Sequence, residues 1–266
     1  MENVLIGVTL AAVIGWMGYR KGALSFGGAI GATMIGGAVF AAGGWRWSVL
    51  PVGFFVSASI LSFFKKTEKA RTAEKFEKGS RRDFWQTQAN GGTAAVAAIM
   101  AIFSPHPMWI AAFVGAIATA TADTWATELG VLSRQTPRLI TSGKPVPRGT
   151  SGGITVFGSL AAVAGALFIG GLAFLLGIGG IAAVRVAIGG MAGGVVGALA
   201  DSVLGATVQA VYRCPRCGRE TEQRFHRGCG GVQTVHLRGA AWVNNDAVNF
   251  FSTVVGAVVA AIFTFF

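Results

Sequence analysis

Apolar residues in this chain run for about 20 positions at a time, with short polar stretches between the runs. Each run is long enough to cross a bilayer as a helix, the structure that satisfies its own backbone amides where no water is present. The segment Ser104-Pro105-His106-Pro107 divides one long apolar stretch into two. The pattern therefore predicts eight helices, at residues 3–19, 22–43, 46–64, 88–104, 107–129, 152–177, 180–211 and 243–266.

The composition agrees with a membrane protein. Hydrophobic residues make up 53% of the 266 residues, charged residues make up 12%, and there are 40 glycines. Glycine is frequent in membrane helices that pack closely on one another. We expect an all-α fold: one polytopic transmembrane bundle over residues 1–266, with about eight helices, Gly-rich packing and a small cytoplasmic Cys/His loop.

The basic residues predict the orientation of the bundle. Apart from Arg46 and Arg185, all 22 Lys and Arg residues fall in four stretches, 20–21, 65–82, 134–148 and 213–238. These stretches follow the first, third, fifth and seventh predicted helices. Because basic loops stay in the cytoplasm, these four loops are predicted to be cytoplasmic and both termini to lie outside, in the cell membrane.

The net charge of +11 favours an anionic binding partner. Aromatic and basic residues are not interleaved on a soluble face, so we expect no nucleic acid and favour anionic lipid headgroups. Residues 65–87 form a basic, amphipathic cytoplasmic loop that can lie along the membrane surface. A solvated helix that only sets the topology is the alternative.

Four of the 11 acidic residues lie within or at the ends of predicted helices: Asp123, Glu128, Asp201 and Asp246. A carboxylate in a membrane is costly unless it is paired, hydrated or bound to a metal, so each is a candidate functional group. In the predicted topology all four lie toward the cytoplasmic leaflet. Neighbouring hydroxyl groups or Arg185 would satisfy one or two isolated carboxylates, whereas four at one depth favour a shared site.

The spacing within the helices indicates which carboxylates can meet. Asp123 and Glu128 are five residues apart, roughly 140° around an ideal helix, so both reach one site only if the helix ends or distorts near Gly130. Asp246 and Asn249 share a face of the eighth helix. On the seventh helix, glycines and two polar residues recur every four positions and form one stripe, which is typical of a helix packed on a close neighbour. They are Gly189, Gly193, Gly197, Asp201, Gly205 and Gln209.

Carboxylates that converge at a membrane face suit hard cations, and Mg2+ is usual where substrate phosphates complete its coordination. Gly149-Thr150-Ser151-Gly152-Gly153 is predicted to open the sixth helix, with exposed amides at a positive helix end and Lys144 and Arg148 just before it. Gln88-Ala89-Asn90-Gly91-Gly92-Thr93 is predicted to open the fourth. Neither is a Walker loop, and a Gly-Ser helix start is also ordinary punctuation. Together with the acidic residues they predict a cation-phosphate site.

All three cysteines lie in the loop at 213–240, between the last two helices. Cys214, Cys217, His226 and Cys229 have the spacing C-x2-C-x8-H-x2-C, which supplies four ligands for a tetrahedral Zn2+. With every position filled, the ion is predicted to be structural. Reduced cysteines without metal remain an alternative because the second half of the pattern is not a standard C-x2-C, and His236 is a rival fourth ligand.

Four blocks of the chain resemble the hallmark blocks of an integral-membrane family. They are residues 123–130, 149–153, 201–209 and 245–250. A Gln-Ala-Asn-Gly block at 88–91 and the Cys/His loop extend the resemblance over roughly residues 1–266. The family was long classed as a domain of unknown function and contains the plant phytyl-phosphate kinase.

This resemblance implies phosphorylation of a prenyl monophosphate, such as phytyl or geranylgeranyl monophosphate, by a nucleoside triphosphate, with CTP the expected donor and ATP the alternative. Phosphoryl transfer needs positioning and charge neutralisation, and a phosphate acceptor needs no strong base. The implied Mg2+ ligands are Asp123, Glu128, Asp201 and Asp246. The implied substrate- and nucleotide-binding residues are Asn90, Lys144, Arg148, Gly149, Thr150, Ser151, Gly152, Gly153, Gln209, Asn245 and Asn249.

Two other functions remain open at this point. One is a CTP-dependent cytidylyltransferase, which joins a lipid phosphate to CMP and releases pyrophosphate. The other is a carrier of a lipid phosphate or an ion, whose buried carboxylates bind protons or cations. The crowding of polar residues in one leaflet favours an enzyme over a carrier. Gly-rich helix faces also permit a homodimer.

Overall fold

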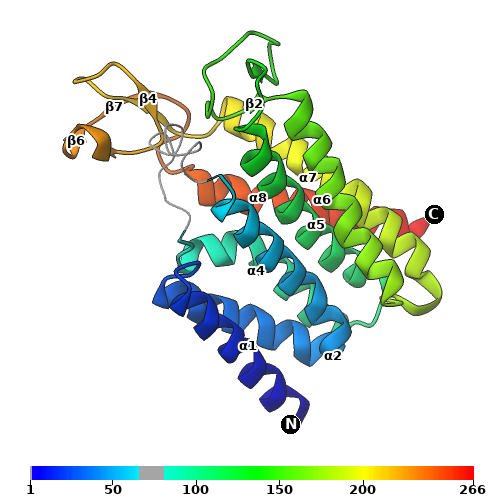
Figure 1. Cartoon of the computed structure of the whole chain (residues 1–266). Coiled ribbons are helices and arrows are strands. Elements are labelled where there is room, and N and C mark those ends of the chain that lie inside the picture. The colour runs from blue at the N-terminus through cyan, green and yellow to red at the C-terminus, as the bar shows by residue number, and fades with distance from the viewer. Residues whose placement is uncertain (1, 66–80) are drawn as a thin grey trace.

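The computed structural model describes residues 2–65 and 81–266. These residues form a bundle of α-helices with a small lobe of β-strands at one end (Figure 1). The α-helices of the described residues are α1 (Glu2–Arg20), α2 (Phe26–Phe63), α4 (Phe84–Phe103), α5 (Pro107–Gly130), α6 (Val156–Leu175), α7 (Ala183–Thr207) and α8 (Asn245–Ile262). Short 3-10 helices are η1 (Gly180–Ala182), η2 (Arg227–Cys229) and η3 (Phe263–Phe265).

Four of these helical segments are long and apolar enough to cross a bilayer: Phe26–Phe63, Val156–Leu175, Gly180–Thr207 and Asn245–Phe265. The segment Val4–Arg20 is apolar but shorter. The all-α membrane fold is thus supported by the structure. The predicted basic segment lies mostly outside the described residues, which resume at position 81.

Helix α2 contains two of the predicted helices. Gly44 interrupts it with φ 62° and ψ −154°, a backbone conformation that suits glycine. A Cβ on Gly31, before the kink, would meet Thr87 of α4, whereas a Cβ on Gly53, after it, would meet Phe168 of α6. The two arms therefore pack against different neighbours, and the predicted boundary between residues 43 and 46 falls on the kink.

Helix α5 lies inside the bundle. Residues 111–122 are all buried, and the helix packs against α2, α4, α6, α7 and α8. Thr119 is satisfied there, since its hydroxyl donates to the carbonyl of Gly115 at 2.8 Å and to that of Gly193 in α7 at 3.2 Å. Because neighbouring helices surround α5, it can carry polar residues that a helix exposed to lipid would not tolerate.

Two Gly-rich segments were wrongly predicted to open helices. Helix α4 begins at Phe84, where Asp83 and Gln86 form a capping box, so the predicted opening at residue 88 lies in its second turn. Helix α6 begins at Val156 after its N-cap Thr155, so the segment 149–153 precedes the helix and does not open it. In both cases a side chain that caps the backbone fixes the helix start, and a Gly-rich segment does not.

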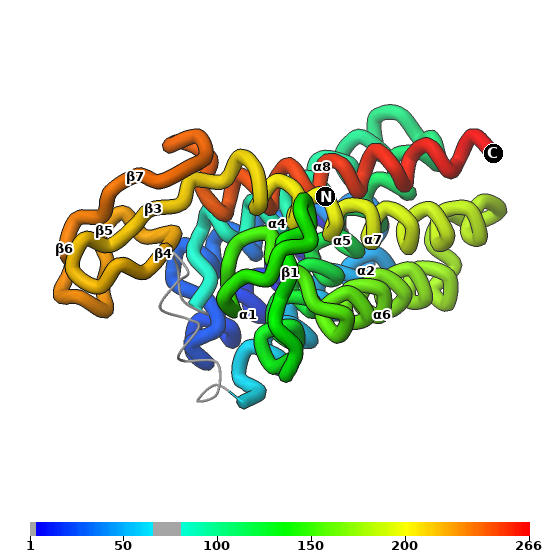
Figure 2. The backbone as a smooth tube through the Cα atoms, turned by 90° about the horizontal axis from the view of Figure 1, so that it is seen from above, coloured from blue at the N-terminus to red at the C-terminus, as the bar shows by residue number. Residues whose placement is uncertain are grey.

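The Cys/His loop folds into a small β lobe that the apolar pattern did not predict. Strand β3 (Val211–Arg213) lies between β4 (Glu220–Thr221) and β7 (Val235–Arg238), and both pairings are antiparallel. Strand β5 (Phe225–His226) pairs with β6 (Val232–Gln233), and β1 (Arg138–Leu139) pairs with β2 (Gly153–Ile154) in the loop before α6. Figure 2 shows the lobe projecting beyond the helices, beside the start of α8.

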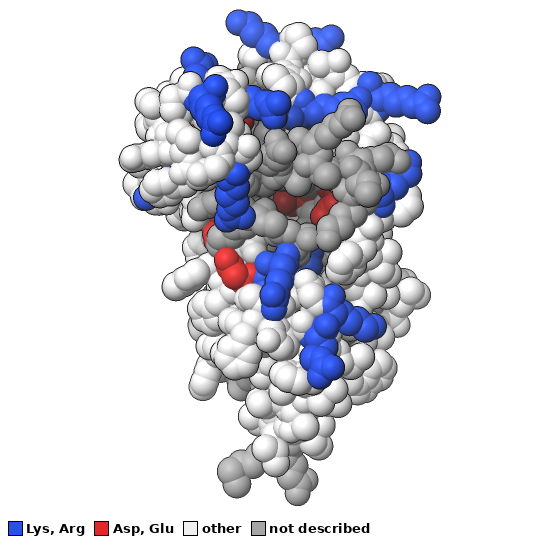
Figure 3. All heavy atoms as spheres, turned by 60° about the vertical axis from the view of Figure 1, so that its left-hand side comes forward, with Lys and Arg blue, Asp and Glu red and all other residues white. Residues whose placement is uncertain are grey.

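The polar loops meet at this end of the bundle. Arg81 donates through Nε to the carbonyl of Leu24 at 3.0 Å. Arg238 donates to the carbonyls of Gly205 and Ala206 at the end of α7, at 3.2 and 2.9 Å. Figure 3 shows Lys and Arg side chains spread over this face, with acidic side chains between them. The cytoplasmic orientation of this end and the outer position of the termini stay predictions.

The α7–α8 contact yields a first testable prediction. A Cβ on Gly193 would collide with the carbonyl oxygen of Gly256 in α8. Gly193→Ala should therefore destabilise the protein by about 1–3 kcal/mol, the usual range for overpacking, and lower its melting temperature in detergent. Gly171→Ala is the matched control, because nothing lies within 4 Å of a Cβ there. Equal melting temperatures for the two variants would contradict the packing described here.

Candidate functional site

The carboxyl groups of Asp123 in α5 and Asp201 in α7 lie in hydrogen-bonding contact with each other. The hydroxyl of Ser252, from α8, also reaches Asp201. The Oδ2 atom of Asp201 is buried and has no hydrogen-bond partner among the described residues. Two carboxylates in contact repel each other unless they share a proton or a cation. This pair is therefore a candidate cation site.

The glycines of α7 explain why the two carboxylates meet. A Cβ on Gly190 would touch Val114, and a Cβ on Gly194 would touch Ala118, so α5 and α7 run in parallel at close approach. In both contacts the α7 residue lies 76 positions after its α5 neighbour. The same offset carries Asp201 to within one turn of Asp123.

Glu128 contacts a different set of residues. Its carboxylate accepts a hydrogen bond from Ser62 of α2 at 2.5 Å, and it faces the guanidinium of Arg82. Burial lowers the pKa of Arg82, and the charge of Glu128 opposes that shift. Helix α5 continues to Gly130 without ending early, so Glu128 and Asp123 stay on different sides of it. Of the four predicted carboxylates, the structure brings Asp123 and Asp201 together.

Helix α8 begins with several amide side chains and contacts this pair through Ser252. Asn244 caps the helix, with its Oδ1 accepting from the amide of Ala247 at 3.0 Å, and Asn245 and Asp246 follow in the first turn. The carbonyl of Asn249 accepts from the hydroxyl of Ser252 at 2.9 Å. Since Ser252 also reaches Asp201, the second turn of α8 borders the carboxylate pair.

Asn90 is tied into its own helix. Its Nδ2 donates to the carbonyl of Gln86 at 2.8 Å. The next turn of α4 meets α8, where the hydroxyls of Thr93 and Thr253 lie 2.9 Å apart. Helix α4 therefore packs against the middle of α8.

The segment 149–153 forms a turn against the end of α7. The amide of Thr150 donates to Pro147 at 3.2 Å and the amide of Gly153 donates to Thr150 at 2.9 Å. These two of the amides expected to bind phosphate are thus already hydrogen-bonded within the turn. The hydroxyl of Ser151 donates to Glu222 of the β lobe at 2.8 Å. Lys144 and Arg148 are exposed in the loop before the turn.

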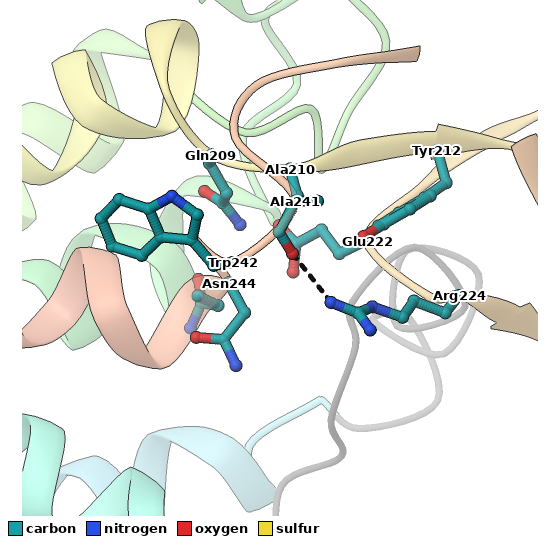
Figure 4. A pocket seen from close by; sticks show the side chains of 9 residues that line it. Gln209, Ala210, Tyr212, Glu222, Arg224, Ala241, Trp242 and Asn244 are labelled. Carbon is teal, nitrogen blue, oxygen red and sulfur yellow. Dashed lines mark hydrogen bonds between the residues drawn. The ribbon is translucent and has the colours of Figure 1, made fainter. Parts of the chain in front are cut away.

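A pocket of about 260 Å³ lies between the β lobe and the start of α8 (Figure 4). Gln209 and Asn245 were expected at the site from the sequence, whereas Glu222 and Arg224 were not. Their signal was weak, because they belong to a loop whose strand pairing is not visible in apolar runs. The pocket is lined by Gln209, Ala210, Tyr212, Glu222, Arg224, Ala241, Trp242, Asn244 and Asn245.

Cys214, Cys217, His226 and Cys229 form a cluster that can hold a metal ion. Their ligand atoms all lie within 4.8 Å of one another, and Cys217 Sγ is 3.6 Å from His226 Nδ1. His236, the rival ligand, instead packs its ring against Tyr212, with centroids 5.5 Å apart. The geometry therefore favours His226.

The thiols of this cluster differ in how readily they ionise. Burial opposes ionisation of Cys214, but hydrogen bonds from the Cys217 amide and from His226 outweigh it and lower the pKa of the thiol to about 6. Burial and the neighbouring Cys217 and Cys214 thiols raise the pKa of Cys229 to about 11. A bound cation would favour the thiolate form of all three.

The fold and the site define an integral membrane protein with a carboxylate pair at one end of its bundle. The chain belongs to the family Integral membrane protein DUF92, which matches residues 9–257. The family resemblance inferred from the sequence blocks is therefore confirmed.

Three relatives illustrate the family. Protein PGR of Arabidopsis thaliana is 29% identical over 282 residues, covering 98% of this chain and 96% of that protein. Uncharacterized membrane protein MJ0933 of Methanocaldococcus jannaschii is 30% identical over 261 residues, covering 98% and 94%. Protein VTE6, chloroplastic, of Arabidopsis thaliana is 24% identical over 242 residues, covering 89% and 64%. No solved structure matches this chain.

The Cys/His cluster yields a second prediction. His226→Ala removes one of four clustered ligands, so the purified protein should lose most of its bound metal. His236→Ala is the matched control and should keep the wild-type metal content. Inductively coupled plasma mass spectrometry of the purified proteins gives metal per chain. Equal metal content in the two variants, or a loss only in His236→Ala, would contradict the assignment of His226.

Proposed function

We propose that this protein is a Mg2+-dependent lipid-phosphate kinase. It transfers a phosphoryl group from a nucleoside triphosphate to a prenyl monophosphate, such as phytyl or geranylgeranyl monophosphate, and forms the prenyl diphosphate. The observation that carries this proposal is the contact between the Asp123 and Asp201 carboxyl groups. Carboxylate oxygens beside a phosphate-binding region are the ligands that Mg2+ uses in phosphotransferases.

The proposed reaction is an in-line exchange of one P–O bond for another. An oxygen of the lipid phosphate attacks the γ-phosphorus of the donor, and the bond from that phosphorus to the β–γ bridging oxygen breaks. The nucleoside diphosphate leaves with the electron pair of that bond. Because the attacking group is already an ionised phosphate, the reaction needs no strong general base. This fits a site rich in carboxylates and amides.

Asp123 and Asp201 would hold Mg2+, which neutralises charge on the donor phosphates when it is bound. Ser151 would position those phosphates from the turn before α6, where it contacts Glu222. The start of α8 would also position them, since Ser252 of α8 reaches Asp201. Lys144 and Arg148 are exposed and can approach the phosphates from the loop before the turn. Glu128 and Asp246 stay predicted metal ligands, Glu128 with the contacts to Ser62 and Arg82 described above.

The acceptor class rests on the family, which contains the plant phytyl-phosphate kinase. The shape of the molecule agrees with a lipid acceptor, because α6 exposes large apolar side chains, including Leu160 and Leu167, and can lie against lipid. A prenyl tail would then stay in the bilayer while its phosphate reaches the polar end of the bundle. CTP is the expected donor, with ATP the alternative.

We also propose that Zn2+ occupies the Cys/His cluster. Three thiolates and one imidazole form a common closed set of structural zinc ligands. The ion would stabilise a β lobe whose strands are two to four residues long. Strands this short are not stable alone.

Product analysis tests the proposed reaction. The purified protein in detergent is incubated with phytyl or geranylgeranyl monophosphate, Mg2+ and either CTP or ATP, and the products are read by mass spectrometry. A kinase adds one phosphoryl group to the lipid and releases a nucleoside diphosphate. A nucleotide-linked lipid with pyrophosphate would indicate the cytidylyltransferase, and the absence of any covalent product would contradict both enzymes.

A variant tests the role of the carboxylate pair. Asp201→Asn removes a negative charge from the proposed Mg2+ site and should lower turnover by about 10²–10³, the loss typical of a group that stabilises charge in the transition state. Glu220→Gln is the control, because Glu220 is exposed and pairs with Arg213 at 3.6 Å. Undiminished turnover in a folded Asp201→Asn protein would rule out the proposed metal site.

A further inference from the structure

The pocket beside the β lobe contains a buried hydrogen-bond donor that has no acceptor among the described residues. Gln209, just after α7, is only 2% exposed, and its Nε2 has no hydrogen-bond partner among the described residues. Figure 4 shows its side chain directed into the pocket, between Trp242 and Glu222. A buried amide donor without a partner lowers stability. A ligand that presents an acceptor in this pocket would remove that cost.

The other groups around the pocket suit a nucleoside. Trp242 is 72% exposed and offers a flat aromatic face. Arg224 is held at the rim by a hydrogen bond from its Nη2 to the carbonyl of Ala241 at 2.8 Å (Figure 4). Asn245 and Glu222 add an amide and a carboxylate to the wall. Proteins bind nucleobases with aromatic faces for stacking and with amide and carboxylate groups for the polar edge.

The size of the pocket fits part of a nucleotide. Its volume of about 260 Å³ is just below the roughly 300–1,000 Å³ of pockets that enclose a whole drug-sized ligand. A base and its sugar are of that size, and a triphosphate chain would extend out of the pocket. Glu222 links the pocket to the carboxylate pair, because it accepts a hydrogen bond from Ser151 at 2.8 Å and its charge acts on Asp201.

We infer that this pocket binds the nucleoside of the phosphoryl donor, with Gln209 Nε2 donating to an acceptor on the base or the sugar. The inference rests on the proposed kinase function and adds to it the place of the donor. The phosphates then run past Ser151 toward Asp123 and Asp201. One wall of the donor site belongs to the β lobe, so the Cys/His cluster supports nucleotide binding as well as the fold of the loop.

Binding to the full chain in detergent tests this placement. The probes are the β,γ-methylene analogues of CTP and ATP, with inorganic tripolyphosphate as a ligand that lacks a nucleoside, and affinities come from isothermal titration calorimetry with Mg2+. Gln209→Met should weaken binding of the preferred analogue about tenfold, the loss expected for about one hydrogen bond from a neutral donor. It should leave tripolyphosphate binding unchanged.

Two exposed tryptophans provide a matched pair of variants that do not disturb the core. Trp242→Ala removes the aromatic face of the pocket and should weaken nucleotide binding at least tenfold. Trp85→Ala is the control, because Trp85 is 67% exposed at the start of α4 and does not line the pocket. This pair keeps the test decisive even if Gln209→Met fails to fold.

The outcomes separate the two proposals. If the wild type phosphorylates the lipid while Gln209→Met and Trp242→Ala bind the analogue as tightly as the wild type does, the nucleoside site is overturned and the kinase stands. If either variant is folded and loses nucleotide and tripolyphosphate equally, the pocket binds phosphate and the nucleoside assignment is wrong. If the wild type binds neither analogue, the kinase proposal fails and the nucleoside site fails with it.

Discussion

The close parallel contact between α5 and α7 positions the acidic site. Gly190 and Gly194 of α7 face Val114 and Ala118 of α5 with no room for a side chain, and this register brings Asp201 to Asp123. In lipid, helix association depends on such close packing because apolar side chains gain little by leaving an apolar solvent. A carboxylate pair inside the bundle adds a repulsion that packing alone must resist, and a cation shared by the pair would turn that repulsion into a bond between the helices.

The β lobe extends the site away from the membrane helices. Its Glu222 joins the turn at 149–153 through Ser151, and its Arg224 is tied to the segment that leads into α8. The pocket itself is lined by residues between positions 209 and 245, and the turn at 149–153 is joined to its wall through Glu222. Because the strands of the lobe are short, a metal ion held by the four clustered Cys and His side chains would stabilise it. In the proposed function the Cys/His cluster and the acidic pair have separate roles: the cluster would hold the loop, and the pair would face the donor phosphates.

The sequence predicted the membrane class and the family, because apolar runs and short motifs are local signals. The starts of α4 and α6 differ from the prediction because capping side chains, and not Gly-rich segments, begin these helices. For α4 the sequence does contain the signal, since Asp83 and Gln86 have the spacing of a capping box. The partners of Glu128 could not be read, since Ser62 lies 66 residues away and only the packing of α2 on α5 brings it close. The β lobe was missed for a similar reason, because strands of two to four residues leave no periodic pattern.

Binding of Mn2+, a spectroscopic substitute for Mg2+, tests most directly whether Asp123 and Asp201 share one ion. Electron paramagnetic resonance of the purified protein gives the affinity of the wild type, of Asp123→Asn, of Asp201→Asn and of the double variant. If one ion bridges both carboxylates, each single variant should lose most of the affinity and the double variant should be little worse than either. Affinities that equal the wild type in both single variants, or losses that simply add in the double variant, would contradict a shared metal site.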